Sequence, residues 1–306
     1  MSFTLYFAGG QAKAVEEILM QKNFSKLCSQ EYDRKTAEMW LNYSKEVEHR
    51  NIFIDSGAFS AWSKGKPLDV DNYIEFLNKN SEAFTAFASI DNIPGELTRA
   101  ATLKEREESP MLSWENYLYM RERINEKDKL VPTFHAGEDL KHLSNLLEVK
   151  LDNKHIPYIA LGGTVGATMN YKKKWYSTCF KVISESSNPN VKVHAFGMTA
   201  FDVLESFPFY SADSTSWIMT TANGNLMTDY GIVAITERSN HKPNYIGKLP
   251  LTIQENIKSQ LAKYELSLEE CAEVFNTREL ANAYYLHDRA KNYKFKGNNR
   301  YQKRLF

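Results

Sequence analysis

The sequence predicts an α/β protein built as a (β/α)8 TIM-type barrel with a helical C-terminal appendage. The chain has 306 residues, of which 42% are apolar and 25% charged, so it is a folded protein with a large core. Short strand-like runs alternate with helical patterns, and this alternation stops near residue 250. We therefore expect a barrel catalytic domain over residues 1–250 and a helical appendage with a basic tail over residues 251–306.

Eight short runs of apolar and β-branched residues are the predicted strands. Most are followed by helical patterns with a 3.6-residue period, such as Leu140, Leu143 and Leu147. Alternating β and α elements imply parallel strands with right-handed crossovers, and eight such units close into a barrel. A doubly wound open sheet is the alternative. The predicted strands are residues 3–8, 52–54, 84–90, 130–134, 158–161, 191–196, 209–212 and 232–235.

Beyond residue 250 the pattern is helical. Leu251, Ile257 and Leu261 have helical spacing, and Ser267 with Glu270 forms a capping box that predicts the start of another helix. We find no internal repeat and no linker rich in Pro or Ser, so the appendage is expected to pack on the barrel.

The overall charge is balanced, with 38 basic and 38 acidic residues, which argues against a globally basic nucleic-acid coat. The distribution is uneven. Residues 289–306 contain seven basic residues and no acidic one, which leaves 31 basic against 38 acidic residues in the rest of the chain. The C-terminus is therefore a cationic tail.

The three cysteines, Cys28, Cys179 and Cys271, are far apart in the sequence and form no C-x-C or C-x-x-C motif. They predict neither a local thiolate zinc site nor a disulfide framework. The sequence also contains no signal-like N-terminus and no apolar run of 18 residues, so we expect a cytoplasmic protein without a membrane partner.

Reactive groups of a (β/α)8 barrel lie at the carboxyl ends of its strands, where this sequence places Asp55, Asp91, His135 and Asp213. An Asp at such a position is more often a helix N-cap than a catalyst. Asp55 and Asp213, however, are each followed by a Ser that could cap instead, which favours a functional role. The four residues could also ligate a metal, but no H-x-H motif follows the first strand, and we expect neither a metal nor a cofactor.

Six segments, in order, resemble the queuine/archaeosine tRNA-guanine transglycosylase family. The family pattern is D-S-G-G/A-F-Q, an Asp closing the next strand, Q-G-G, G-G-L-A-V-G-E, an M-G-V-G-like segment and an F-D nucleophile loop. Together the matches span roughly residues 50–225. They are D-S-G-A-F-S from Asp55, then Asp91, H-A-G from His135, G-G-T-V-G-A from Gly162, F-G-M-T from Phe196 and A-D-S from Ala212.

The resemblance implies a base exchange at C1′ of a guanine nucleotide through a covalent glycosyl-enzyme intermediate. Asp213 would be the nucleophile and Asp55 the acid/base. Asp91 would bind the amidine edge of guanine. The other base-binding residues would be Gly162 and Gly163 as main-chain donors, Met198 or Phe59 as stacking partners, and Ser56 and His135 beside the base.

The departures from the family pattern concern the substrate. The cysteines of the tRNA enzymes' zinc site are absent, His135 replaces a Gln that reads the base, and Ser60 replaces another Gln. A zinc-less relative with a basic tail resembles the phage and bacterial branch that modifies DNA, a modification that protects it from restriction. The expected partners are DNA, with the target nucleotide unstacked, and a free base such as 7-cyano- or 7-aminomethyl-7-deazaguanine.

Two basic segments are the predicted DNA contacts, because they combine cations with aromatic residues. Three function classes stay open beside this one: exchange in tRNA, hydrolysis by a nucleoside or glycoside hydrolase barrel, and a non-catalytic binding subunit. Retention of both Asp55 and Asp213 argues against the last. The predicted DNA contacts are Lys172, Lys173 and Lys174 in one segment, and Lys294, Lys296, Arg300, Lys303 and Arg304 in the tail.

Overall fold

A nearly closed, TIM-like parallel barrel is the centre of the fold. The computed structural model describes residues 3–10, 12–29, 33–47, 51–96 and 98–297. Nine strand segments are hydrogen-bonded in the order β5-β4-β3-β2-β1-β11-β10-β9-β6. They are β1 (Thr4–Ala8), β2 (Ser25–Ser29), β3 (Ile52–Asp55), β4 (Ala86–Ala88), β5 (Leu130–Val131), β6 (Thr133–His135), β9 (Tyr158–Gly162), β10 (Lys192–Ala195) and β11 (Ser211–Ser214).

The two ends of this strand order are consecutive in the chain, because only Pro132 separates β5 from β6. Proline has no N–H to donate to a strand ladder. The first segment pairs with β4, through Ala88 and Val131, and the second pairs with β9, through His135 and Gly162. Residues 130–135 therefore connect both edges of the sheet.

Two of the strand assignments from sequence need correction. The prediction missed β2, whose sequence Ser-Lys-Leu-Cys-Ser is mostly polar, although all five residues are buried. Lys26 is only 1% exposed, and its ammonium lies 5.9 Å from the ring centroid of Trp40, within the range of a cation–π contact. Residues 232–235, predicted as the eighth barrel strand, instead contribute to β13 (Gly231–Ala234), which pairs antiparallel with β12 (Asn225–Thr228), and Ile232 is half exposed.

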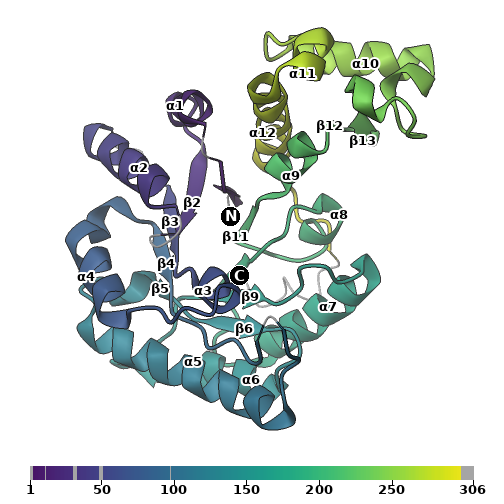
Figure 1. The fold of residues 1–306 in the computed structure, drawn as a ribbon. Helices are drawn as coiled ribbons and strands as arrows, with labels where there is room; N and C mark the ends of the chain where they lie inside the picture. Colours follow the sequence, from purple (N-terminus) through teal and green to yellow (C-terminus); the bar gives the residue numbers. More distant parts are fainter. Residues whose placement is uncertain (1–2, 11, 30–32, 48–50, 97, 298–306) are drawn as a thin grey trace. The chain divides into compact units, whose positions relative to one another are not determined.

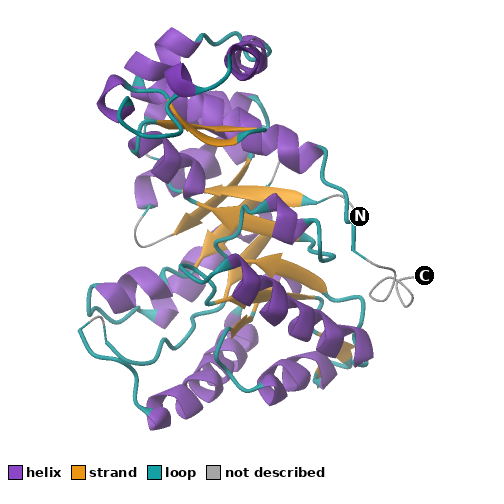
Figure 2. Ribbon diagram, turned by 90° about the vertical axis from the view of Figure 1, so that its right-hand side faces the viewer, coloured by secondary structure: helices purple, strands orange, loops and turns teal. Residues whose placement is uncertain are grey.

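Helices surround the outer face of the strands in the first of two compact units, which comprises residues 3–6, 25–213 and 294–297 of those described (Figures 1 and 2). Inside, aromatic rings fill the barrel, among them Phe53, Tyr158, His194 and Phe196. Helix α3 (Ala58–Ser63) lies near the middle of the view in Figure 1, and the other helices of this unit are α2 (Arg34–Glu46), α4 (Val70–Asn80), α5 (Leu103–Arg123), α6 (Leu140–Glu148), α7 (Met169–Glu185) and α8 (Phe201–Leu204). A small hairpin joins β7 (Lys150–Leu151) to β8 (Lys154–His155).

The second unit comprises residues 7–24 and 214–293 and is largely helical. Its core includes Leu226, Val233, Ile257, Leu261 and Cys271. The prediction of C-terminal helices is confirmed, as is the capping box at Ser267 and Glu270. Apart from the β12–β13 hairpin, its elements are α1 (Lys13–Gln21), α9 (Ser216–Ala222), α10 (Leu251–Ala262), α11 (Leu268–Glu273) and α12 (Phe275–Lys291). No helix in the described part of the chain has the length and apolar character needed to span a membrane.

Candidate active site

The structure places the predicted site residues at the carboxyl ends of barrel strands in the first unit. Asp55 is the last residue of β3, His135 of β6 and Gly162 of β9, while Asp213 lies in β11 and Asp91 follows β4. Asp213 and Asp91 both contribute electrostatically to the pKa of Asp55, so the three carboxyl groups share one region.

Asp213 is buried, and two N–H groups orient its carboxylate. His194 Nε2 lies 3.1 Å from Oδ1, and the backbone N–H of Gly197 donates to the same oxygen at 3.0 Å. Both contacts thus orient Oδ1, and Oδ2 accepts no hydrogen bond from the described residues.

A buried hydrogen-bond chain continues from Asp213 into the barrel. Nδ1 of His194 lies 2.6 Å from Oγ of Ser211, which lies 2.5 Å from the hydroxyl of Tyr158. If Tyr158 donates to Ser211 and Ser211 donates to Nδ1, then Nε2 carries the proton that His194 donates to Asp213. Every donor in the chain then has an acceptor, which makes this tautomer of His194 the favoured one.

Asp55 has a different environment from Asp213. The N–H of Gly57, a left-handed residue with φ of 77°, donates to its Oδ2 at 3.0 Å. Burial raises the pKa of the Asp55 carboxyl from 3.8 to about 7; the Gly57 N–H lowers it, and the charges of Asp213, Asp91 and Asp33 raise it further. Asp55 can therefore exchange a proton near neutral pH.

The serines that follow the two carboxylates each accept a backbone N–H two residues further along the chain, but neither is the N-cap of its helix. The N–H of Ala58 donates to Oγ of Ser56 at 3.3 Å, and the N–H of Ser216 donates to Oγ of Ser214 at 2.9 Å. Ser56 is buried, and its hydroxyl supports the turn at the start of α3. Asp213 caps no helix, which leaves its carboxylate to the contacts already described.

His135 lies between two carboxylates. Nε2 is 3.4 Å from Oδ2 of Asp91, and Nδ1 is 3.3 Å from Oε1 of Glu138. Burial alone would lower the pKa of His135, but Asp91 and Glu138 outweigh it and raise the pKa to about 10, so the ring is an imidazolium at neutral pH. The other oxygen of Asp91, Oδ1, is buried and has no hydrogen-bond partner among the described residues.

The glycines beside this cluster allow close packing. A Cβ on Gly162 would lie 3.0 Å from the His135 ring, and one on Gly163, whose φ is +76°, would lie 2.9 Å from the backbone nitrogen of Ala136. Both glycines thus have a steric reason to be there, and their role as donors to a base stays a prediction.

The two predicted stacking residues lie in different environments. Met198 is buried, and its N–H donates to the backbone oxygen of Asp213 at 2.7 Å. Phe59 is 68% exposed, with its ring centroid 5.8 Å from that of Trp62. Phe59 is therefore open to a ligand on the surface, whereas Met198 belongs to the packing behind Asp213.

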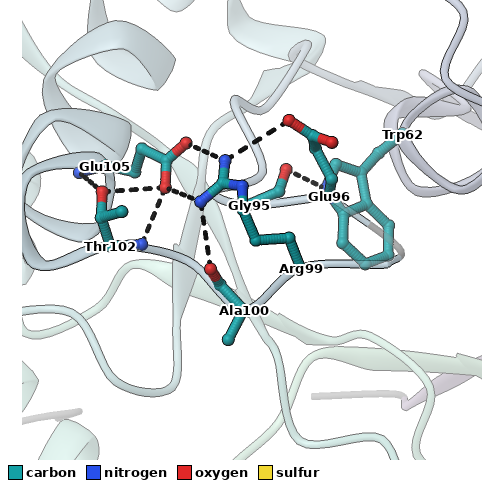
Figure 3. Close-up of polar contacts among 7 residues, drawn as sticks. All are labelled: Trp62, Gly95, Glu96, Arg99, Ala100, Thr102 and Glu105. Atoms are coloured by element: carbon teal, nitrogen blue, oxygen red, sulfur yellow. Dashed lines mark hydrogen bonds and ion pairs between the residues drawn. The ribbon is translucent and has the colours of Figure 1, made fainter.

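The loop that follows Asp91 is held at both ends (Figure 3). The indole N–H of Trp62 donates to the backbone oxygen of Gly95 at 2.8 Å. Arg99 donates to both carboxylate oxygens of Glu105, at 2.9 and 2.5 Å, and to Glu96 at 3.4 Å. Glu105 also completes a capping box with Thr102 at the start of α5. These contacts link Gly95, Glu96 and Arg99 to Trp62 and to the start of α5.

The structure describes only some of the predicted DNA-binding cations. Lys172, Lys174 and Lys294 are at least partly exposed. Lys173 pairs with Asp202 at 2.9 Å, and Lys296 pairs with Glu205 at 2.5 Å. The Lys173–Asp202 pair is exposed, and such pairs contribute only about 0–1 kcal/mol, whereas the Glu205 side chain is only 13% exposed. Arg300, Lys303 and Arg304 lie outside the described residues.

Sequence reasoning missed four members of the site: Tyr158, His194, Ser211 and Glu138. His194 had one usable signal, because strand alternation places it on the same face as Phe196, next to the predicted active-site end. Glu138 follows His135 by three residues, within reach across a tight turn. No local signal links Tyr158 or Ser211 to Asp213, because their connection runs across neighbouring strands.

Within the described residues, no group of three or more His, Cys, Asp or Glu side chains is arranged to hold a metal ion. The three cysteines are buried, and none forms a disulfide. No protein-family model matches this chain, and no curated protein sequence is similar to it at a significant level.

Proposed function

We propose that this protein is a DNA-guanine transglycosylase that replaces guanine in DNA with a 7-deazaguanine. The observation that carries the proposal is the pair Asp55 and Asp213, whose environments differ in the way that acid/base and nucleophile require. Counting residues 130–135 as one strand gives the eight strands of a (β/α)8 barrel, and active sites of that fold lie where these two residues are. The six ordered sequence segments, which resemble those of the tRNA-guanine transglycosylases, support guanine as the base that is exchanged.

In the first half-reaction Oδ2 of Asp213 attacks C1′ of the target nucleotide. The C1′–N9 bond breaks, its electron pair goes to guanine, and Asp55 gives its proton to the departing base. The hydrogen bonds from His194 and Gly197 keep Oδ1 in place, so Oδ2 faces the sugar in a fixed orientation. The product is a covalent ester between C1′ and the protein.

The second half-reaction reverses these steps with a different base. The carboxylate of Asp55 takes the N9 proton of the incoming 7-deazaguanine, and N9 attacks C1′ as the bond to Asp213 breaks. A pKa of about 7 suits both proton transfers, because the acid and the base form are both well populated at neutral pH. Two displacements retain the configuration at C1′.

Asp91 supports recognition of guanine. Its Oδ2 contacts the His135 imidazolium, while Oδ1 has no partner in the described part of the chain and would accept an N–H of the amidine edge. His135 cannot replace the Gln of the tRNA enzymes as an acceptor, since an imidazolium has only donors. We assign it instead to orienting Asp91, whose Oδ2 lies 3.4 Å from its Nε2.

DNA is the substrate we favour over tRNA, on the absent zinc-site cysteines and on the cationic tail. Mass spectrometry of nucleosides tests the proposal, after incubation of the protein with guanine-containing DNA and 7-cyano-7-deazaguanine. We expect the 7-deazaguanine nucleoside in DNA and none in tRNA treated alike. Abasic sites without incorporation indicate a hydrolase, and faster incorporation into tRNA indicates the tRNA enzyme; either result replaces our assignment.

A further inference from the structure

Val165 is the tip of a short turn that follows β9 at the carboxyl end of the barrel strands, and it is 79% exposed. The N–H of Ala167 donates to the backbone oxygen of Thr164 at 3.1 Å, which closes the turn. Gly166, with a φ of +78°, takes the left-handed position that a type II turn requires. An apolar side chain is therefore held in solvent at the edge of the barrel where the candidate site lies.

The turn is anchored on both sides. Thr164 is buried, and its hydroxyl lies 3.3 Å from the hydroxyl of Tyr176, which is buried as well. On the other side the N–H of Tyr171 donates to Oγ1 of Thr168 at 3.3 Å, so that Thr168 is the N-cap of α7. A tip fixed in this way loses little conformational freedom when it contacts a partner.

The tip lies beside a residue that orients the proposed nucleophile. A Cβ on Gly197 would lie only 2.8 Å from Cγ2 of Val165, so glycine at that position makes room for the tip. The N–H of Gly197 in turn donates to Oδ1 of Asp213. Val165 therefore borders the place where the target nucleotide must lie for Asp213 to reach its C1′.

Positive charge follows the tip along the chain. Helix α7 begins four residues after Val165 and contains four lysines, with no acidic residue before Glu185. Lysines attract the phosphates of DNA, and apolar side chains of DNA-binding proteins enter between neighbouring bases. This segment thus combines the two kinds of contact with which a protein opens a base stack.

We infer that Val165 enters the DNA stack, in the space that the target guanine leaves when its nucleotide swings out of the duplex. The inference rests on the proposed function. Asp213 can reach C1′ only after this extrusion, which sacrifices base stacking and base pairing. An apolar side chain in the vacated space replaces part of the lost stacking and hinders the return of the guanine. The step changes no covalent bond.

Guanine exchange in duplex DNA and in the corresponding single strand tests this role. We expect Val165→Ala to lower kcat/KM for the duplex about tenfold and for the single strand less than about twofold, because only the duplex has a paired stack to open. Val165→Leu keeps an apolar tip and should retain duplex exchange. The matched control is Leu103→Ala, which shortens an equally exposed side chain at the start of α5 and should affect neither substrate.

Fluorescence measures the extrusion itself. Pyrrolocytosine placed opposite the target guanine becomes brighter when the guanine leaves the pair, and the measurement needs no free base. We expect the wild-type protein to brighten this duplex, and Val165→Ala to brighten it less.

Equal losses on both substrates, or undiminished duplex exchange in Val165→Ala, overturn the inference and leave the proposed function standing. A duplex-specific loss in Phe59→Ala instead of Val165→Ala also overturns it. If the wild type exchanges guanine in neither substrate but brightens the duplex in a manner that depends on Val165, the proposed function fails and the role of Val165 stands. If the wild type neither exchanges guanine nor brightens the duplex, both fail.

Discussion

Replacement of Asp55 by Asn has opposite effects on stability and on activity. The substitution keeps the size of the side chain and an oxygen that can accept from the N–H of Gly57. It removes the negative charge that burial disfavours and the proton that the reaction needs. Both effects follow from the pKa of Asp55, so a single variant tests the electrostatic account of the site.

The stability effect follows from linkage. The folded-state pKa of Asp55 is raised from 3.8 to about 7, so the folded state binds this proton more tightly than the unfolded state. Its contribution to stability is present below pH 3.8 and is lost as the pH rises through 7. One pKa unit corresponds to about 1.4 kcal/mol, so the loss at pH 8 is roughly 4 kcal/mol. Asn does not titrate and avoids this loss.

We expect Asp55→Asn to be more stable than wild type at pH 8, by up to roughly 4 kcal/mol, and nearly equal to it at pH 4. Urea denaturation across this range measures the difference. Asp128→Asn is the matched control, because Asp128 is exposed and has no hydrogen-bond partner within the described chain. It should leave the pH dependence unchanged.

The activity effect has the opposite sign. Loss of a general acid/base lowers the rate about 10²- to 10⁴-fold, and the wild-type rate should be highest near pH 7. Exchange of radiolabelled guanine measures it. A variant as active as wild type would remove Asp55 from the reaction, and one whose stability follows the wild-type pH dependence would refute the raised pKa.

Four further predictions concern the nucleophile, its support, metals and the tail. Asp213→Ala should abolish exchange and the covalent DNA adduct on denaturing gels, with the fold retained by circular dichroism; a normal exchange rate would contradict the assignment. His194→Phe removes the hydrogen bond to Oδ1 of Asp213 and should lower kcat about 10- to 100-fold with the KM for DNA unchanged. An unaltered kcat would show that the buried hydrogen-bond chain from Tyr158 to Asp213 has no role in the reaction. Exchange should survive extensive chelation, and zinc bound in a one-to-one ratio would contradict this. Deletion of residues 298–306 removes three predicted phosphate contacts, Arg300, Lys303 and Arg304. The slope of log affinity for DNA against log salt concentration should then become shallower by roughly 2 to 3. An unchanged slope would place the phosphate contacts elsewhere.

Local sequence patterns predicted much of the fold and the strand ends at which the candidate site residues lie. Apolar runs that end in Asp, His or Gly predicted the barrel and the edge at which Asp55, Asp91, His135 and Asp213 lie. This works because parallel strands with helical crossovers bring all their carboxyl ends to one side. The C-terminal helices were equally readable from their periodicity and from the capping box at Ser267.

Tertiary structure decided what local patterns do not contain. The strand β2 is mostly polar in sequence, but it lies between β1 and β3, contacts α2 and is buried throughout, whereas the apolar residues 232–235 contribute to a separate hairpin. The chain from Tyr158 to Asp213 and the ion pairs of His135 join residues on different strands and loops. Hydrogen bonding and charge act through space, so the protonation of Asp55 and His135 depends on neighbours that only the folded chain brings within reach.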